Sequence, residues 1–289
     1  MLVDTIPGAP ARPRRSWPLR WLAVPLTGVV LFGAVLTVLV NTGNPIYLPC
    51  LLLLGAGIAP ATLTTLVTEL EAAPSLSFAR VLAAAVFGGV IGGVIAGQLE
   101  FDTARALGSL PYLMVGLIEE LAKLAVPVLL LSWQRPRPRA IEGLVLGVAV
   151  GSGFAAMETM GYAFVALLSN GGHLQQVDSL LLMRAVGSLG GHAAWTGLAC
   201  AAWFASRGAR HRWIGRLRFL GTLTGVVFLH AEWDAASAAG HGYILIGLAG
   251  FLLLAATAWR LHRQPHPKPE AEPAPRPRSA ARDATALVG

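Results

Sequence analysis

Residues 141–168 read IEGLVLGVAVGSGFAAMETMGYAFVALL, an apolar run interrupted by two carboxylates, Glu142 near its start and Glu158 in its interior. A helix that crosses the hydrocarbon core of a bilayer needs about 20 predominantly apolar residues, and this run exceeds that length. An ionisable side chain inside such a segment is costly and usually functional. The stretch therefore predicts a membrane-spanning helix that carries one functional carboxylate, Glu158.

The whole chain has the composition of a membrane protein. Of its 289 residues, 55% are apolar and only 13% are charged, whereas a soluble domain averages about 25% charged residues. We expect eight spans, at about 21–40, 46–67, 78–97, 110–131, 141–168, 181–206, 214–238 and 242–260. These spans predict an all-α fold, a polytopic transmembrane helix bundle.

The basic residues predict the orientation of this bundle. With the N-terminus placed in the cytoplasm, only Arg105 and Arg184 of the 22 lysines and arginines fall on the outer side, and Lys123 is buried. Cytoplasmic loops carry an excess of basic residues, so both termini are expected to be cytoplasmic. The formal net charge of +7 could suggest nucleic acid as a partner. The clustering of the charges beside apolar runs indicates membrane orientation instead, with no nucleic acid bound.

Three regions follow from this pattern: a basic cytoplasmic N-terminus at 1–20, a transmembrane helical domain at 21–260, and a disordered Pro/Arg/Ala-rich cytoplasmic tail at 261–289. Inside the transmembrane domain, glycines recur at four-residue spacing in two spans. They are Gly89, Gly93 and Gly97, and Gly143, Gly147 and Gly151. Small residues at this spacing let helix backbones approach closely, so both sets are predicted to be packing faces.

The fourth span contains VGLIEELAKL at 115–124. Lys123 lies four residues after Glu119 and three after Glu120, so it can meet either carboxylate on one helical face. Burial would disfavour two adjacent carboxylate charges, and a nearby ammonium would help keep one of them ionised. The plainer interpretation is an ion pair that only joins helices.

Three further spans carry ionisable residues in apolar surroundings. Glu158 lies in the fifth span, His192 in the sixth, and His230 and Asp234 lie one turn apart in the seventh. At a rise of about 1.5 Å per residue, four of these side chains fall roughly 12–17 Å below the outer surface: Glu119, Glu158, His192 and His230. Asp234 lies about one turn shallower. Imidazole and carboxylate together suit a borderline divalent ion such as zinc. The sequence therefore predicts one polar site inside the bilayer.

These residues resemble the motifs of the PrsW intramembrane metalloproteases, distant relatives of the CAAX-processing and bacteriocin-processing membrane proteases. The resemblance rests on Glu119-Glu-x-x-Lys123, Phe154-x-x-x-Glu158, His192 within GGHAAWT, and His230-x-x-x-Asp234, in the family's order. It implies a protease-like core at about 110–238 that hydrolyses a peptide bond in or near the membrane. Glu232 departs from the pattern, because an uncharged residue is expected there. A pairing with Arg184, or contact with water near the outer surface, would accommodate it; an altered site is the other interpretation.

The resemblance also implies how the site is divided between metal and catalysis. Glu158, His192 and His230 would hold the divalent metal, expected to be zinc, and leave one position open. Glu119 or Glu120 would act as the general base, and we favour Glu119.

The second glutamate, Glu120 in this assignment, would be oriented or neutralised by Lys123. Three roles remain open for Asp234, as a further ligand, as a partner of His230, or as an oxyanion donor when protonated. A glutamate mechanism without metal fits the same residues.

Two functions outside enzymology compete with this interpretation. Carboxylate–histidine chains also relay protons, so a proton-coupled carrier or channel is the alternative, and a binding or scaffolding membrane protein is a further one. A carrier would favour broken helices in paired halves. Spans four to seven are expected to be continuous, which argues against it.

The expected partners are the lipid bilayer and a single-span membrane protein as substrate. The PrsW protein that gives the family its name cuts an anti-sigma factor, so the resemblance implies a membrane-anchored regulator of that kind. The polar layer lies nearer the outer surface, where water enters most easily, and an unwound segment is easier to cut than a helix. We therefore expect a multi-pass protein of the cell (plasma) membrane that cleaves near the extracytoplasmic side.

Overall fold

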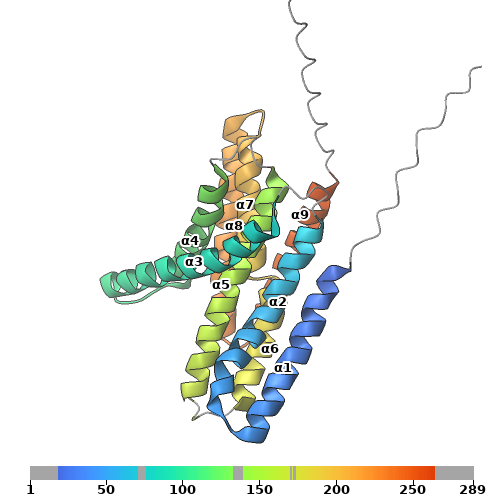
Figure 1. The fold of residues 1–289 in the computed structure, drawn as a ribbon. Coiled ribbons are helices and arrows are strands. Elements are labelled where there is room, and N and C mark those ends of the chain that lie inside the picture. Colours follow the sequence, from blue (N-terminus) through green and yellow to red (C-terminus); the bar gives the residue numbers. More distant parts are fainter. Residues whose placement is uncertain (1–18, 71–75, 133–138, 170, 172–173, 264–289) are drawn as a thin grey trace, which may run out of the picture.

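The computed structural model describes residues 19–70, 76–132, 139–169, 171 and 174–263, which form a helical bundle without strands (Figure 1). Its α-helices are α1 (Ala23–Thr42), α2 (Leu48–Leu70), α3 (Phe78–Leu107), α4 (Tyr112–Ser132), α5 (Ala140–Ser169), α6 (Leu174–Ser188), α7 (His192–Arg207), α8 (Arg212–Ala238) and α9 (Tyr243–His262). Five of them, α1, α2, α3, α5 and α9, are long and apolar enough to cross a membrane. The predicted all-α polytopic bundle is confirmed.

Helix α5 occupies the centre of the bundle and contacts α2, α3, α4, α6, α7 and α9. Between Glu142 and Glu158 it carries no charged residue, and Val148 and Val150 are completely buried. A helix that is apolar on all sides is packed within a bundle rather than at its surface. Helix α1, by contrast, buries only Leu39 and lies at the edge (Figure 1).

The predicted fourth and seventh spans, 110–131 and 214–238, are the single helices α4 and α8. The prediction of one continuous sixth span over 181–206 is wrong, because the chain leaves the helix at 189–191 and forms α6 and α7 instead. With 15 and 16 residues, neither reaches the length of about 20 residues that a spanning helix needs. The expectation of continuous spans four to seven, which argued against a carrier, is therefore also wrong.

The break between α6 and α7 coincides with a close approach of α9. A Cβ added at Gly190 would overlap the carbonyl oxygen of Gly247, and one added at Gly250 would overlap the carbonyl oxygen of Gly190. Only glycine allows backbones to come this close. The Gly190-Gly191 pair thus ends one helix and brings His192 to the first position of the next.

Helix α3 is longer than the predicted span of 78–97. It continues to Leu107, and the Gln98 side chain donates a hydrogen bond to Asp102 one turn later, over 3.1 Å. Gly108 then ends the helix in a left-handed conformation with φ of 73°, which glycine adopts without steric cost. Figure 1 shows α3 crossing the bundle at a steep angle to α1, α2 and α5. Glu100, in the second half of α3, lines a pocket together with residues of α4 and α5.

The glycine faces divide into packed and open positions. Cβ atoms at Gly143, Gly147 and Gly151 would collide with the backbone or side chains of α7, and one at Gly89 would collide with the backbone of α5. For these four glycines the predicted close packing is confirmed. A Cβ at Gly93 or Gly97 would meet nothing within 4 Å. The packing prediction is wrong for these two.

Several helix ends that are expected to be cytoplasmic lie together. Figure 1 places the N-terminal end of α1, the C-terminal end of α9 and the α7–α8 connection at the same end of the bundle. Most of the predicted N-terminal region at 1–20, most of the tail at 261–289 and nearly all of the basic segment at 134–139 lie outside the described residues. The number of spans and the side of the termini stay predictions.

Candidate active site

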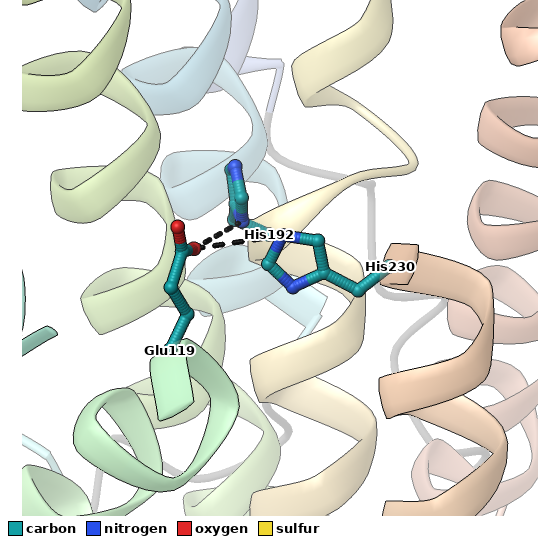
Figure 2. Close-up of side chains that lie close together, drawn as sticks. All are labelled: Glu119, His192 and His230. Carbon is teal, nitrogen blue, oxygen red and sulfur yellow. Dashed lines mark ion pairs between the residues drawn. The ribbon is translucent and has the colours of Figure 1, made fainter. Parts of the chain in front are cut away.

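The polar residues of four helices converge in the interior of the bundle. Glu119 on α4, His192 at the start of α7 and His230 on α8 each offer one ligand atom, and these atoms all lie within 4.8 Å of one another. Figure 2 shows the Glu119 carboxylate pointing toward both imidazole rings. Its Oε2 lies 3.5 Å from His230 Nε2 and 3.8 Å from His192 Nδ1. All three residues are buried.

Lys123 supplies positive charge to this cluster from one turn along α4. It is fully buried, and its Nζ lies 2.6 Å from Glu120 Oε1 and 3.2 Å from Glu119 Oε2. The ammonium also lies 2.8 Å from His192 Nδ1 and 4.3 Å from the centre of the Phe154 ring. The shorter of the two ion pairs is the one to Glu120.

Glu120 is completely buried and fixes the orientation of a histidine. Its Oε1 lies 3.1 Å from His230 Nδ1, and its Oε2 accepts a hydrogen bond from Thr196 Oγ1 over 3.3 Å. A carboxylate on one ring nitrogen makes that nitrogen the donor and leaves the other nitrogen free to bind a metal. His230 Nε2 is thus the atom turned toward Glu119.

His192 is held between a cation and an anion. Lys123 Nζ lies 2.8 Å from His192 Nδ1 on one side of the ring. On the other side, His192 Nε2 lies 2.7 Å from Glu158 Oε2. The same carboxylate oxygen accepts from Arg184 Nη2 over 2.6 Å, and Arg184 Nε donates to Thr159 Oγ1 over 2.9 Å.

Asp234 and Glu232 differ in their relation to the site. Asp234 Oδ2 lies 3.6 Å from His230 Nε2, at the margin of the cluster. Glu232 is exposed, and Arg184, the partner considered for it from the sequence, is engaged by Glu158 instead. Glu232 therefore lies away from the converging side chains.

Close helix packing holds the histidines in place. A Cβ added at Gly116 on α4 would lie 2.9 Å from the carbonyl oxygen of Val227 and 3.3 Å from His230 Cβ. A Cβ at Gly151 on α5 would overlap the carbonyl of His192. The fully buried Trp195 stacks on His230 with ring centroids 4.7 Å apart. The backbone positions of both histidines are thus set by contacts that admit no larger side chain.

The donor set fits the divalent metal that the sequence predicted. Two imidazoles and a carboxylate are the protein ligands of several catalytic zinc sites. The three mutually close residues include Glu119, whereas the predicted carboxylate ligand, Glu158, lies beside His192 and faces Arg184. Both Glu119 and Glu158 are therefore near enough to His192 to be the carboxylate ligand of the metal.

Sequence reasoning missed three residues of this site. Arg184 and Thr196 contact the predicted carboxylates directly, and Glu100 on α3 lines a pocket together with Glu119. The lone arginine in SLLLMRAV was assigned to the outer side by the charge count, although an ionisable residue among apolar neighbours is itself an indication of function. Glu100 was not considered because the predicted third span ended before it.

Comparison with known proteins identifies one family. The family model described as "PrsW family intramembrane metalloprotease" matches residues 18–259. No curated protein and no solved structure matches the chain.

Proposed function

The chain belongs to the PrsW family of intramembrane metalloproteases, and on that premise we propose that the buried cluster around Glu119, His192 and His230 is its catalytic centre. The family makes the chain a membrane peptidase that uses a divalent metal and acts on a membrane protein. The observation that carries the proposal is the convergence of these three side chains, from three helices, to within 4.8 Å. Scattered packing residues would not present two imidazoles and a carboxylate to one another.

The proposed ligands are Glu158, His192 and His230, with zinc as the metal. The Glu120 carboxylate faces His230 Nδ1, which fixes the orientation of that ring and leaves Nε2 for the metal. His192 Nε2 lies beside Glu158, the proposed carboxylate ligand. A divalent ion held there would supply the Lewis acidity that polarises a peptide carbonyl and favours deprotonation of water.

Glu119 is the proposed general base. It lines a pocket next to the cluster, whereas Glu120 is completely buried and already engaged by Lys123, His230 and Thr196. Glu119 would take a proton from the attacking water as the new carbon–oxygen bond forms. It would return that proton to the leaving nitrogen as the carbon–nitrogen bond breaks.

Lys123 and Glu120 then act as positioning residues. Lys123 stabilises the negative charge of both glutamates, and Glu120 orients His230. Asp234 Oδ2 lies 3.6 Å from His230 Nε2, the nitrogen that would bind the metal. None of these residues needs to touch the substrate for this role.

A proton-coupled carrier is the competing function, and the break between α6 and α7 is the observation that favours it. Carriers place such breaks in corresponding positions of two repeated halves. Among the described helices, no second break separates two helices that had been predicted as one span. Membership of a peptidase family decides for hydrolysis.

The substrate is proposed to be a single-span regulator of the anti-sigma-factor kind in the plasma membrane, cut near the extracytoplasmic end of its helix. The support is the predicted orientation, in which the polar layer lies nearer the outer surface. Water is needed for hydrolysis, and a segment that has left its helix no longer shields its peptide bonds by internal hydrogen bonds.

The test is cleavage of a panel of single-span host proteins by the purified protein in liposomes. We expect one new pair of termini near the outer helix end, abolished by a chelator, restored by zinc, and absent with Glu119→Gln. Cleavage that persists in Glu119→Gln would overturn the assignment of the site. A cut on the cytoplasmic side would overturn the proposed orientation.

A further inference from the structure

A pocket of about 420 Å³ adjoins the proposed catalytic cluster, where α3 crosses α4 and α5 (Figure 1). We call it the α3–α5 pocket. Its lining includes Gly93, Gly97 and Glu100 on α3, Glu119 on α4, and Glu158 and Gly161 on α5. Its size lies within the range of about 300–1,000 Å³ that is typical of ligand-binding pockets. It therefore offers direct access to Glu119, the proposed base.

The walls of this pocket are open because three residues have no side chain. A Cβ added at Gly93, Gly97 or Gly161 would meet nothing within 4 Å. Elsewhere in the same two helices, glycines such as Gly89 and Gly153 are pressed against a neighbouring backbone. The open glycines thus do not serve helix packing. Their effect is to leave room beside Glu119.

Glu100 gives the pocket an unused hydrogen-bond acceptor. Its Oε1 is shielded from solvent and has no hydrogen-bond partner among the described residues, and Glu100 lines the same pocket as Glu119. A buried acceptor without a donor is costly. A bound molecule that brings an N–H group would relieve that cost.

The dimensions of the pocket decide between possible occupants. One turn of an α-helix with its side chains, 5.4 Å tall and 10–12 Å wide, fills about 420–610 Å³, so a helix would be limited to a single turn. An extended chain needs about 160 Å³ per residue, from its rise of 3.3 Å and spacings of 4.8 and 10 Å. The pocket therefore holds two to three extended residues. An acyl chain has no hydrogen-bond donor to offer Glu100 or the other two carboxylates of the pocket, Glu119 and Glu158.

We propose that the α3–α5 pocket binds the scissile segment of the substrate in an extended conformation, with Glu100 accepting a hydrogen bond from one of its backbone N–H groups. Within a bilayer, a segment that has left its helix needs acceptors for its N–H groups, because lipid provides none. The inference rests on the proposed function, because it takes Glu119 as the base.

Filling the pocket tests this directly. Gly97→Leu and Gly161→Leu are expected to lower kcat/KM for a cleaved single-span substrate by about tenfold or more, chiefly through KM. Thermal stability should not fall below that of wild type and zinc content should match it, because the added atoms enter open space. Gly225→Leu on α8 is the matched control: its Cβ also meets nothing within 4 Å, but it does not line the pocket. This variant should cleave as wild type does.

A second pair of variants tests Glu100. Glu100→Gln keeps a carbonyl acceptor and should retain most of the activity, whereas Glu100→Leu should raise KM by up to about tenfold, the worth of one hydrogen bond. A photoreactive residue in place of Gly161 should cross-link the substrate next to the cut, and one in place of Gly225 should not.

The outcomes separate the two proposals. If Glu119→Gln still cleaves, the proposed function fails. If Glu119→Gln is inactive while both pocket-filling variants show wild-type kcat/KM and no cross-link forms at position 161, the proposed function stands and the substrate pocket is overturned.

Discussion

At the scale of single residues, Lys123 is the side chain on which the polar cluster depends most. It is the buried cation between Glu119, Glu120 and His192, within 2.6–3.2 Å of an atom of each. Removing one member of a buried ion pair leaves its partner charged and desolvated, which is more damaging than replacing the whole pair by apolar residues. Here one substitution would strand two carboxylates at once.

Lys123→Met is therefore expected to destabilise the protein by about 3–5 kcal/mol, measured as the loss of thermal stability in detergent. Arg105→Met on the exposed part of α3 is the control and should change stability by less than about 0.5 kcal/mol. Equal effects of the two substitutions would show that Lys123 does not neutralise the cluster.

The roles of Glu119 and Glu158 are separable by metal content. Glu119→Gln should keep its zinc and lose activity by about 10²–10⁴-fold, as expected for loss of a general base, while Glu158→Gln should bind zinc more weakly. The measurement is bound metal after dialysis, set beside the cleavage rate. If Glu119→Gln loses its zinc and Glu158→Gln keeps it, the carboxylate ligand is Glu119, whose ligand atom lies within 4.8 Å of those of both histidines.

Residue spacing predicted those contacts that lie within one helix. Lys123 meets Glu119 and Glu120 because residues three and four apart share a helical face, and His230 lies near Asp234 for the same reason. The pairing of Arg184 with Glu158 joins α6 to α5 across 26 positions of sequence. It depends on how two helices pack, which periodicity in one sequence does not specify.

At the scale of helices, the break before α7 places His192. The predicted sixth span, 181–206, runs through Gly190 and Gly191. Only the approach of Gly247 and Gly250 on α9 to Gly190 reveals why the helix stops there. The element boundary is thus set by tertiary packing rather than by local propensity.

Two glycine-to-alanine substitutions should therefore have opposite effects on the stability of the protein. Gly190→Ala is expected to cost about 1–3 kcal/mol, because its Cβ overlaps the backbone of α9, and to weaken zinc binding by displacing His192. Gly221→Ala on α8, where a Cβ meets nothing within 4 Å, should stabilise by about 0.5–1 kcal/mol through helix propensity. Thermal unfolding and zinc content measure both effects. A neutral Gly190→Ala would contradict the role assigned to the break.

At the scale of the whole molecule, composition predicted a helical membrane protein, and the family and the fold agree with it. The individual spans are harder to recognise, because two of the helices that form the site, α4 and α8, carry several charged residues. Helix α4 contains Glu119, Glu120 and Lys123, and α8 begins among arginines and ends with Glu232 and Asp234. Charges that serve the site reduce the very hydropathy by which spans are recognised.

The arginines between α7 and α8 make a prediction about the whole bundle. Arg207, Arg210, Arg212, Arg216 and Arg218 surround this connection, whereas residues 239–242 between α8 and α9 contain none. Basic residues are retained on the cytoplasmic side during insertion. Reporter fusions at Gly208 should therefore report the cytoplasm, and fusions at Gly240 and Gly171 the outside.

The compartments reported by these fusions indicate from which side of the membrane water reaches the site. Opposite compartments for Gly208 and Gly240 would establish that α8, which carries His230, crosses the membrane. Identical compartments would mean that α8 does not cross and that the expected depth of the cluster is wrong. Exchanged compartments, with Gly208 outside, would turn the site toward the cytoplasm and move the expected cut to the inner end of the substrate's helix. Replacing Arg210, Arg212, Arg216 and Arg218 with glutamine should weaken the cytoplasmic signal at Gly208, since the bias depends on these charges rather than on the apolar segments.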